Sequence, residues 1–410
     1  MMTILDELSR EETWEAFLQS KRERNQLTKK ELRELEDFIR DKAYLRITGT
    51  LSFGLPEKKI LSKLDSSKKR TVYMFSAEEN QVLKLLAHLL YKYDGVLSDN
   101  CYSFRMRQTA KTAFDKILRI KDLDKRYVLK VDIHDYFNSI DTKILEEQLR
   151  EVLAEDLPLY GFLEELLEKD ACVFNGETVK EKRGAMAGVP LSSFFANLYL
   201  RDLDFAMEKA GIPYFRYSDD IIVFAQSEDE REEVFRAIMK TLEEKKLELN
   251  PSKVLRADPG ESWNFLGFRY EDRKIDLSDV TVTKMKGKIR RYAKKLYRKR
   301  KRAGKDFDWA LKTMIRHFDA KFYDFTGDHE FTWTRFYFPV ITDDKGLHAI
   351  DAYMQEYLRF LDTGRHYKGN YRITYEDLTR RGYTPLVSEY YRWKEENREL
   401  NRQNQRKTDL

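Results

Sequence analysis

Residues 212–225 read Ile-Pro-Tyr-Phe-Arg-Tyr-Ser-Asp-Asp-Ile-Ile-Val-Phe-Ala, so two adjacent acids stand between two apolar runs. The pattern predicts a β-hairpin of Pro213–Tyr217 and Ile221–Ala225 that turns at Ser218-Asp219. Two carboxylates held side by side against a buried sheet repel each other, and a divalent cation relieves that repulsion. Mg²⁺ suits such a place because it takes oxygen ligands and shares its coordination shell with substrate phosphates. Taken alone, the acidic pair is also explained as a solvated hairpin turn.

Another acid ends an earlier apolar strand. The segment Val128-Leu-Lys-Val-Asp132-Ile predicts a strand over Tyr127–Ile133, after which the chain leaves the sheet through His134–Asn138. Asp132 stands 87 positions before Asp219, and an isolated acid in such a place is commonly a cap or a turn residue. If the two strands are neighbours, however, Asp132, Asp219 and Asp220 converge on one point. Three converging carboxylates are what two-metal phosphoryl transfer requires.

The remaining elements favour an α+β chain in which helices pack on an antiparallel sheet. Residues 3–45 are typical of charged helices, and a strand is expected over 71–75. Ser76 with Glu79 three residues later is a capping box, which predicts that a helix begins there. Further elements are expected as helices at Asp141–Glu168, Ser192–Ala210, Glu228–Lys246 and 283–303, as short strands at Val254–Arg256 and Phe265–Tyr270, and as a mostly helical tail to Leu410.

Positive charge is concentrated in one short stretch. Residues 281–305 hold thirteen Lys or Arg and no Asp or Glu, and this +13 within a net charge of +5 leaves −8 for the rest of the chain. A basic segment on a mildly acidic body indicates a docked polyanion. Charge alone equally fits a solvated basic helix or a helix on a membrane surface.

Cysteine content and hydropathy narrow the class of protein. The only cysteines are Cys101 and Cys172, which excludes a disulfide framework and a zinc site built from cysteines alone. Met1–Glu12 carries early acids without a long apolar stretch, which argues against a secretory signal. No apolar run approaches the roughly 20 residues that span a bilayer. We therefore expect a cytoplasmic protein without a membrane partner.

The segments around the three aspartates resemble the reverse transcriptase family of RNA-directed DNA polymerases. Asp132-Ile-His-Asp-Tyr-Phe137 resembles the family's first polymerase motif, and Tyr217-Ser-Asp-Asp220 resembles its Tyr-x-Asp-Asp box. Other segments between residues 60 and 270 resemble, in the family's order, two fingers motifs (68–75 and 102–105), the motif that supports nucleotide and template (187–200), the palm-closing motif (249–253) and the primer grip (264–268). The resemblance implies a right-hand polymerase with fingers and palm, followed by a helical thumb.

The resemblance also implies a metal site. Asp132 and Asp219 would bind metal directly, and Asp220 would complete the acidic cluster. The backbone carbonyl of Ile133 would be a ligand of the nucleotide-bound ion. The implied cofactor is Mg²⁺, as two ions, with Mn²⁺ as the alternative metal.

Four residues are expected at the nucleotide on the same grounds. Lys69 and Arg70 would reach the triphosphate from the fingers, an arrangement that suits the fixed donor fork of Arg. Ala187 lies in the motif that supports the incoming nucleotide, and Lys253 would donate a proton to pyrophosphate. An ordinary basic turn is the alternative explanation for Lys69 and Arg70, and Lys253 is equally well a surface lysine.

Phe137, five residues after Asp132, occupies the family's steric-gate position. A flat aromatic ring there would crowd a 2′-hydroxyl and so favour deoxynucleotides. The alternative is that Phe137 only packs in the palm. The sequence departs from the family where Met186-Ala187-Gly188 replaces the common Pro-Gln-Gly. Losing the Gln removes a polar contact near the nucleotide sugar and the templating base, which puts fidelity and template handling in doubt.

Four domains are expected from the resemblance and the charge pattern. These are a helical N-terminal extension (1–55), fingers and palm (56–280), a basic thumb helix (281–305) and a helical aromatic and basic C-terminal region (306–410). As a thumb, the basic helix would follow the sugar–phosphate backbone of a primer–template duplex. The residues expected to contact nucleic acid are Arg105, Phe265, Gly267, Lys284, Lys288, Arg291, Lys295 and Arg298.

Three segments of the tail, 333–339, 363–371 and 381–391, mix aromatic and cationic residues. Such mixtures suit stacking on unpaired bases, while tyrosine-rich helix packing explains them equally well. The tail is similar to those of stand-alone bacterial reverse transcriptases associated with antiphage defence. That similarity would imply a dedicated non-coding RNA partner, or priming from a protein hydroxyl.

The sequence therefore predicts an RNA-templated DNA polymerase whose partners are dNTPs, an RNA template and nascent DNA. Template-independent or protein-primed synthesis on the same fold stays open, as does a catalytically inactive palm that serves as an RNA-binding scaffold. No obvious ribonuclease H acids, Cys/His-rich endonuclease or integrase accompany the motifs, which favours a stand-alone enzyme over a self-sufficient mobile element. The sequence does not indicate the template, the primer or the oligomeric state.

Overall fold

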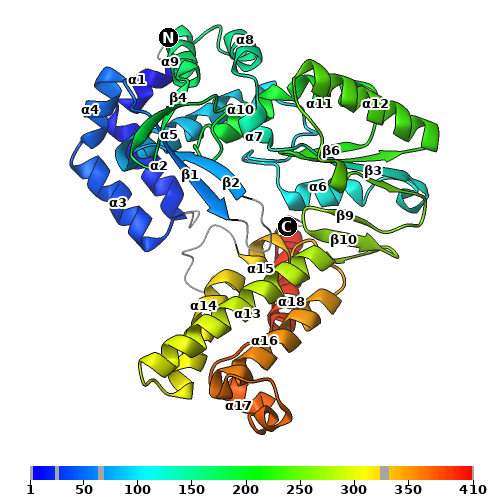
Figure 1. Ribbon diagram of the computed structural model, residues 1–410. Coiled ribbons are helices and arrows are strands. Elements are labelled where there is room, and N and C mark those ends of the chain that lie inside the picture. The colour runs from blue at the N-terminus through cyan, green and yellow to red at the C-terminus, as the bar shows by residue number, and fades with distance from the viewer. Residues whose placement is uncertain (1–2, 24–26, 63–68, 324–331, 409–410) are drawn as a thin grey trace. The chain divides into compact units, whose positions relative to one another are not determined.

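The computed structural model describes residues 3–23, 27–62, 69–323 and 332–408. The chain divides into two compact units, Met1–Leu266 and Gly267–Leu410, and Figure 1 labels their elements. The division falls before residue 280, where the sequence places the end of the palm. The reason is that the strand Lys274–Leu277 bonds to the later helical part: the Thr342 amide donates to the Ile275 carbonyl at 2.8 Å.

The centre of the first unit is a four-stranded antiparallel sheet in the order β6-β7-β3-β8. Its strands are Tyr214–Tyr217 (β6), Asp220–Ala225 (β7), Tyr127–Asp132 (β3) and Leu255–Ala257 (β8). The predicted hairpin is confirmed, because β6 and β7 pair directly and are joined through Ser218 and Asp219. β7 is buried beyond Asp220 because it lies between two strands.

Both faces of this sheet are covered (Figure 1). One face packs against α12 (Glu228–Glu244), and α11 (Arg201–Lys209) lies beside β6. On the other face, the Phe224 ring lies 5.2 Å from the ring of Trp263 in β9 (Trp263–Phe265). Trp263 in turn stacks on Phe114 of α6 (Ala110–Ile117). Every residue of β7 after Asp220 is apolar and buried, so both faces of this strand pack against other layers.

A second sheet, in the order β2-β1-β4-β5, belongs to the same unit. Its strands are Glu57–Ser62 (β1), Lys69–Met74 (β2), Ala171–Phe174 (β4) and Glu177–Lys180 (β5). The sequence predicted only the β2 strand of this sheet. The β4–β5 hairpin was missed because β5 is exposed along its whole length and has no run of apolar residues to reveal it.

Helices build the apolar core of the first unit. They are α1 (Ile4–Leu8), α2 (Glu11–Glu23), α3 (Lys29–Arg40), α4 (Ala43–Thr50), α5 (Ala77–Leu89), α7 (Tyr136–Ser139), α8 (Thr142–Val152), α9 (Leu157–Glu168) and α10 (Ser192–Tyr199), with short 3₁₀ helices at Leu90–Val96, Leu123–Lys125 and Pro251–Lys253. Trp14 is fully buried against the rings of Phe38 and Tyr44. The predicted capping box is confirmed, since the Glu79 amide donates to Ser76 Oγ and the Ser76 amide donates to Glu79 Oε2.

Two helix predictions were wrong in extent. Asp141–Glu168 forms two helices, because Asp156 caps the second one by accepting from the Leu159 amide at 3.2 Å, and Pro158 lies in its first turn. Ser192–Ala210 is likewise divided, at Leu200, into α10 and α11. The first break carries a local signal in Asp156 and Pro158, whereas the break at Leu200 lies in a run of good helix formers and leaves no such signal in the sequence.

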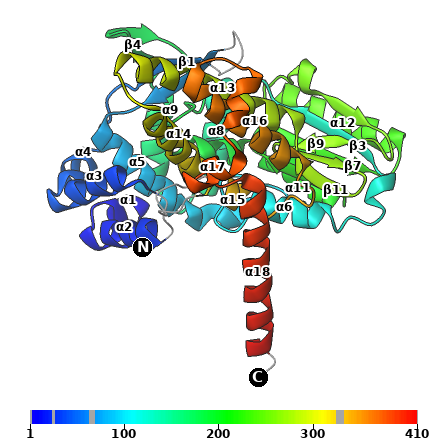
Figure 2. The same cartoon turned by 90° about the horizontal axis from the view of Figure 1, so that it is seen from below.

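The second unit is a hairpin followed by helices. Its elements are β10 (Phe268–Glu271), β11 (Lys274–Leu277), α13 (Asp279–Arg302), α14 (Phe307–Phe322), α15 (Trp333–Phe336), α16 (Lys345–Thr363), a 3₁₀ helix at Lys368–Arg372, α17 (Tyr375–Arg380) and α18 (Leu386–Thr408). The basic stretch forms one continuous helix that packs along α16 and α14. The later part of α18 extends away from the other helices of this unit (Figure 2).

The predicted α+β class is confirmed. The described segments contain no helix with the length and apolarity needed to cross a bilayer.

Candidate active site

Three aspartates meet at one edge of the central sheet. Asp132 ends β3 and lies directly opposite Asp220, which begins β7. Asp219 precedes Asp220 in the turn, and its carbonyl accepts a hydrogen bond from the Ile133 amide at 3.0 Å. Directly opposed residues of an antiparallel pair project on the same face. The pairing of β3 with β7 thus brings together acids that are far apart in the sequence, as the sequence predicted.

Two lysines neutralise part of this acidic edge. Lys253 Nζ donates to Asp132 Oδ2 at 2.5 Å, and Lys130 Nζ lies 3.0 Å from Asp220 Oδ1. Burial raises the pKa of Asp219, and the Asp132 charge raises it further. Burial also raises the pKa of Asp220, to about 6, against the opposing effect of Lys130. The site therefore holds more negative charge than its lysines balance.

The donor set suits a hard divalent cation. Carboxylates and backbone carbonyls are the oxygen ligands that Mg²⁺ prefers. In the part of the chain that the structure describes, however, no three His, Cys, Asp or Glu side chains are arranged to hold a metal ion as they stand. The lysines explain the difference, because the Lys253 ammonium occupies one oxygen of Asp132. A cation bound at this edge would therefore compete with Lys253 for Asp132.

A buried polar network fixes the turn from behind. Ser218 adopts a left-handed conformation, with φ of 61°, and its amide donates to Ser103 Oγ at 2.8 Å. Ser103 Oγ donates to Asn197 Oδ1 at 2.9 Å, and Asn197 Nδ2 donates to the Ser103 carbonyl at 2.7 Å. The turn is thereby tied to α10 and to the loop before α6.

The network is anchored by an ion pair between Arg216 and Asp204, whose side chains are both 0% exposed. Arg216 Nε donates to Asp204 Oδ1 at 2.8 Å, and Arg216 Nη1 donates to the Ser218 carbonyl at 3.3 Å. Burial acts to lower the pKa of Arg216, but the Asp204 charge raises it well above the ordinary value. The sequence analysis missed both residues. The signal was present, since Arg216 is a charged residue inside an otherwise apolar strand.

Phe137 is the second residue of α7. This helix begins directly after Asp135, which has a left-handed φ of 41°. The ring centroid of Phe137 lies 6.3 Å from that of Phe104 and 5.8 Å from that of Tyr136. Phe104 also lies 6.4 Å from Tyr217, the residue that begins the acidic box. The aromatic cluster therefore runs from the expected steric gate to the turn that carries the aspartates.

The loop 184–188 joins the central sheet to β2. Gly184 has φ of 54°, and a Cβ there would lie 2.5 Å from the Asn138 carbonyl oxygen, so only glycine fits. The Tyr73 amide of β2 donates to the Ala187 carbonyl at 2.8 Å. Ala187 itself is buried, so its contribution to a nucleotide site comes through the position of its backbone.

Lys69 and Arg70 are both exposed at the start of β2. Arg70 acts electrostatically on Asp219, whose pKa it lowers against the larger effect of burial. This influence places the positive charge of Arg70 within reach of the acidic edge.

Two residues expected at nucleic acid are turned inward. The Arg105 side chain is 6% exposed, and its guanidinium donates to Asp94 Oδ1 at 2.9 Å and to the Ser98 carbonyl at 2.6 Å. Phe265 is buried against Phe114. Both side chains are occupied by contacts inside the protein, which argues against the predicted contacts with nucleic acid. The prediction failed because a motif match gives the position of a residue but not the direction of its side chain.

Residues of the second unit expected at nucleic acid lie in the hairpin and on α13. Gly267 has φ of 86°, and a Cβ there would lie 2.9 Å from Thr281 Oγ1, so it has a packing role. On α13, one face is buried through Met285, Ile289, Ala293 and Leu296. Of the cations, Lys284, Lys295 and Arg298 are exposed, whereas Lys288 and Arg291 are half-buried beside the packed face.

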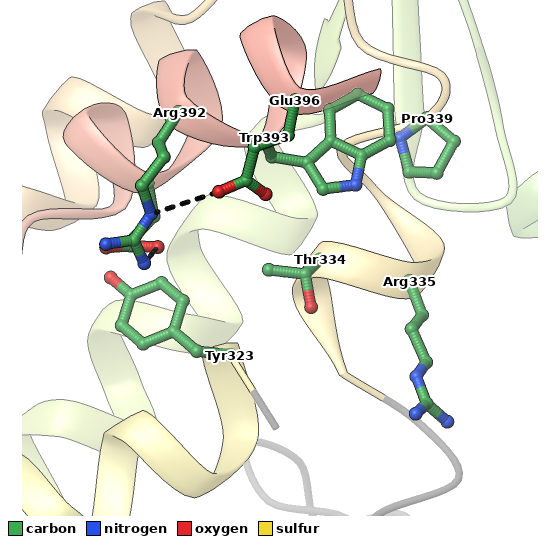
Figure 3. Close-up of a pocket in the computed structure, with 8 residues that line it drawn as sticks. Tyr323, Thr334, Arg335, Pro339, Arg392, Trp393 and Glu396 are labelled. Carbon is green, nitrogen blue, oxygen red and sulfur yellow. Dashed lines mark hydrogen bonds and ion pairs between the residues drawn. The ribbon is translucent and has the colours of Figure 1, made fainter. Parts of the chain in front are cut away.

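Two cavities lie elsewhere, and neither is lined by Asp132, Asp219 or Asp220. One, of about 500 Å³, lies beside Asn138 and Gly184, and its Lys246 pairs with Asp141 at 2.6 Å. The other, of about 450 Å³, lies within the second unit between α14, α15 and α18 (Figure 3). There Arg392 pairs with Glu389 and Glu396. Both cavities mix cations with acids, so neither offers a clear site for an anionic ligand.

An antiparallel sheet that presents three aspartates at one edge, with a strand hairpin joined to it through a glycine loop, defines a polymerase palm with its fingers. A family model described as "Reverse transcriptase (RNA-dependent DNA polymerase)" matches residues 55–270, which is more than half of the chain. The chain belongs to this family, whose members are nucleotidyltransferases. No curated protein matches the chain in sequence.

Several solved structures of yeast telomerase resemble the chain distantly. Apo telomerase of Candida tropicalis matches with 16% identity and a TM-score of 0.44 over 76% of this chain and 64% of that chain. A form truncated from the C-terminal domain matches with 16% identity and a TM-score of 0.43 over 54% and 55%. Telomerase of Candida albicans with a fragment of telomeric RNA matches with 14% identity and a TM-score of 0.43 over 81% and 62%. The chain thus spans 55–64% of the length of these telomerase chains.

Replacing Arg216 by Met should lower the free energy of unfolding by about 3–5 kcal/mol, because it leaves Asp204 as an unpaired buried charge. Urea unfolding followed by circular dichroism measures the change. Arg40→Met is the matched control: Arg40 and its partner Asp37 are both largely exposed, and a pair of that kind contributes about 0–1 kcal/mol. Equal losses of unfolding free energy in the two variants would show that the buried pair contributes no more to stability than an exposed pair.

Mg²⁺ or Mn²⁺ should raise the melting temperature of the protein, because a cation among the aspartates relieves their repulsion. An ion at ten times its Kd contributes about 1.4 kcal/mol, which corresponds to a shift of roughly 2–5 °C. Thermal unfolding with and without the ion measures it. The shift should be lost in Asp132→Asn/Asp219→Asn and retained in Asp202→Asn, which alters an exposed acid on α11. An undiminished shift in the double variant would place the ion elsewhere.

Proposed function

We propose that this protein is an RNA-directed DNA polymerase that adds dNTPs to a 3′-hydroxyl. The observation that carries the proposal is the convergence of Asp132, Asp219 and Asp220 at one sheet edge. Membership of the reverse transcriptase family supports it independently. An inactive scaffold is the weaker explanation, because buried carboxylates with raised pKa values are costly to retain without a use.

The three aspartates, with the carbonyl of Ile133, are the groups that would hold two Mg²⁺ ions, or Mn²⁺ in their place. When bound, such ions activate the attacking hydroxyl and neutralise the triphosphate and the leaving group. The protein's own task is then to position the reactants and to supply fixed charge. Arg70 and Lys69 would contribute charge from β2, at the side where the triphosphate would lie.

Lys253 lies beside Asp132 rather than on a remote surface. Its ammonium donates to Asp132 Oδ2 at 2.5 Å while about half of the side chain remains exposed. A lysine released from Asp132 when metal binds would keep a proton to donate to pyrophosphate as it leaves. This contact supports the catalytic assignment of Lys253 over the simpler surface one.

The second unit supplies a surface for the product duplex. The exposed cations of α13 lie on the face opposite its buried residues. A continuous basic helix of this kind binds sugar–phosphate backbones irrespective of sequence, with strong salt dependence. We assign α13 the role of a thumb, with the fingers and palm before it.

The biological setting that we propose is bacterial antiphage defence in the cytoplasm, with a dedicated non-coding RNA as template or partner. Its support is the similarity of the tail to those of stand-alone bacterial reverse transcriptases. Sequencing the nucleic acid that copurifies with the protein tests this directly. Recovery of one defined RNA would support the proposal, and recovery of bulk cellular RNA would contradict it.

Asp219→Asn should reduce dNTP incorporation on a defined RNA template with a DNA primer by about 10³-fold, since metal contributes several kcal/mol to the transition state. Primer extension measures the rate, and sequencing of the product identifies what was copied. Asp202→Asn should keep full activity. Incorporation that persists in Asp219→Asn would exclude this active site. Product that ignores the template would favour template-independent synthesis, and product linked to protein would favour protein priming.

Phe137→Ala should weaken discrimination against rNTPs by roughly 10–100-fold in the ratio of kcat/KM values, the range that a pocket wall provides against an added hydroxyl. Phe137→Tyr keeps the flat ring and should keep the discrimination. Phe104→Ala removes a neighbouring ring of the same cluster and serves as the packing control. If Phe137→Ala slows dNTP and rNTP incorporation alike, Phe137 is a packing residue and not a gate.

A further inference from the structure

The second unit exposes a group of tyrosines on one loop. Tyr367, Tyr371 and Tyr375 are 50%, 67% and 40% exposed, and they lie between the end of α16 and the first residue of α17 (Figure 1). Three large exposed aromatic side chains within one short segment, 367–375, indicate an interaction surface, whereas single ones scattered over a surface are ordinary.

This loop differs from the other two aromatic and basic segments of the tail. In 333–339, Trp333 and Phe338 are buried, and in 381–391, Tyr383 and Tyr390 are buried. Those two segments serve mainly for helix packing. In the loop after α16, the rings instead remain outside the core, so packing does not explain them.

The loop is held rigidly beneath its rings. The buried Asn370 donates from Nδ2 to the Arg365 carbonyl at 2.6 Å and accepts at Oδ1 from Thr363 Oγ1 at 3.0 Å. The Tyr297 hydroxyl of α13 donates to the Thr363 carbonyl at 3.0 Å. Gly364 has φ of 74°, and a Cβ there would lie 2.3 Å from Tyr297 Cζ. A surface fixed in this way loses little conformational entropy on binding.

Two of the rings are supported from one side. The Arg359 guanidinium lies 5.2 Å from the centre of the Tyr371 ring, and Arg359 Nε donates to the Ile373 carbonyl at 2.8 Å. The Tyr367 ring lies against Gly369, where a Cβ would be 2.4 Å from Tyr367 Cε2. Both rings are nevertheless half or more exposed. Each therefore offers a face on which another flat group can stack.

The charge of the loop is positive. Residues 364–375 contain Arg365, Lys368 and Arg372 and no Asp or Glu, and Glu376 and Asp377 follow Tyr375. Arg372 pairs with Asp362 at the base of the loop, while Arg365 and Lys368 are exposed. Exposed rings beside exposed cations are the combination that binds single-stranded nucleic acid, in which bases stack and phosphates pair with cations.

The loop is also attached to the proposed thumb helix. Arg300 of α13 donates from Nη1 to the Asp362 carbonyl at 2.7 Å, and Tyr297 makes the contact described above. The exposed cations Lys294, Arg298 and Lys301 lie in the same part of α13. The loop therefore lies beside the C-terminal turns of α13, where a strand leaving a duplex bound to this helix would meet it.

We propose that Tyr367, Tyr371 and Tyr375, with Arg365 and Lys368, form a tyrosine platform that binds unpaired RNA beyond the copied duplex. The choice of RNA rests on the proposed function. The DNA product of such an enzyme leaves paired with its template, so the strand left unpaired is RNA. Stacking on tyrosine is tolerant of base identity, and the platform therefore retains the RNA without selecting its sequence.

The first test measures binding of the full-length protein to a labelled, unstructured RNA oligonucleotide by fluorescence anisotropy. Tyr367→Ala/Tyr371→Ala/Tyr375→Ala should weaken the Kd by roughly 10-fold or more, because each stacked base contributes on that scale. The triple replacement by Phe keeps the rings and should bind within about 2-fold of the wild type. Tyr391→Ala removes a tyrosine on α18 that is 54% exposed and should leave the Kd unchanged. Unchanged binding by the triple Ala variant would overturn the proposal.

The second test separates the platform from the active site. Asp219→Asn should keep its affinity for unpaired RNA while losing DNA synthesis, whereas the triple Ala variant should extend a short annealed primer–template at the wild-type kcat. An unpaired extension on the RNA template should lower the wild-type KM, and the triple Ala variant should lose that advantage. If only an extension on the DNA strand lowers the KM, the assignment to RNA is wrong. Failure of all DNA synthesis would contradict the proposed function while leaving the binding result intact.

Discussion

The active-site edge depends on the buried ion pair between Arg216 and Asp204. Neither side chain reaches solvent, so each charge relies on the other and on the hydrogen bonds around it. Breaking such a pair leaves an uncompensated charge in a medium that solvates it poorly. The pair therefore disfavours every arrangement in which β6 and α11 separate. Because Arg216 also bonds to the carbonyls of Ser218 and Asn197, the same constraint fixes the turn that carries Asp219.

The rest of the site follows from that fixed turn. Asp219 and Asp220 are held beside Asp132 by the pairing of β7 with β3, and their mutual repulsion and burial raise the pKa values of Asp219 and Asp220. The ammonium groups of Lys130 and Lys253 compensate part of this charge. A divalent cation would bring more positive charge to this edge than either lysine, since each lysine pairs with only one of the acids. The loop 184–188 then joins β2, with Arg70, to the same edge.

Much of this site was open to prediction, and the failures have a common cause. The hairpin, the strand that ends at Asp132 and the capping box at Ser76 were all recognisable because each depends on residues close together in the chain. Arg105 and Phe265 were assigned to nucleic acid from their motif positions, but their side chains turn inward to Asp94 and Phe114. Lys130 was not predicted as a site residue, because the sequence around a lysine in a strand does not show that a carboxylate from another strand lies beside it. The β4–β5 hairpin was not predicted, because exposed strands are stabilised by pairing with a neighbour rather than by apolar residues of their own.

The sequence by itself determined which chemical groups the protein carries, their order along the chain and the local elements in which they lie. It did so because helix caps, strand alternation and turns depend on interactions between residues only a few positions apart. The tertiary structure alone decided that Asp132 faces Asp220, that Lys253 reaches Asp132, that Arg216 is paired with Asp204, and that Tyr371 is exposed while Tyr390 is buried. Each of these facts depends on how distant segments pack, and burial and electrostatic partners are properties of that packing rather than of any local pattern.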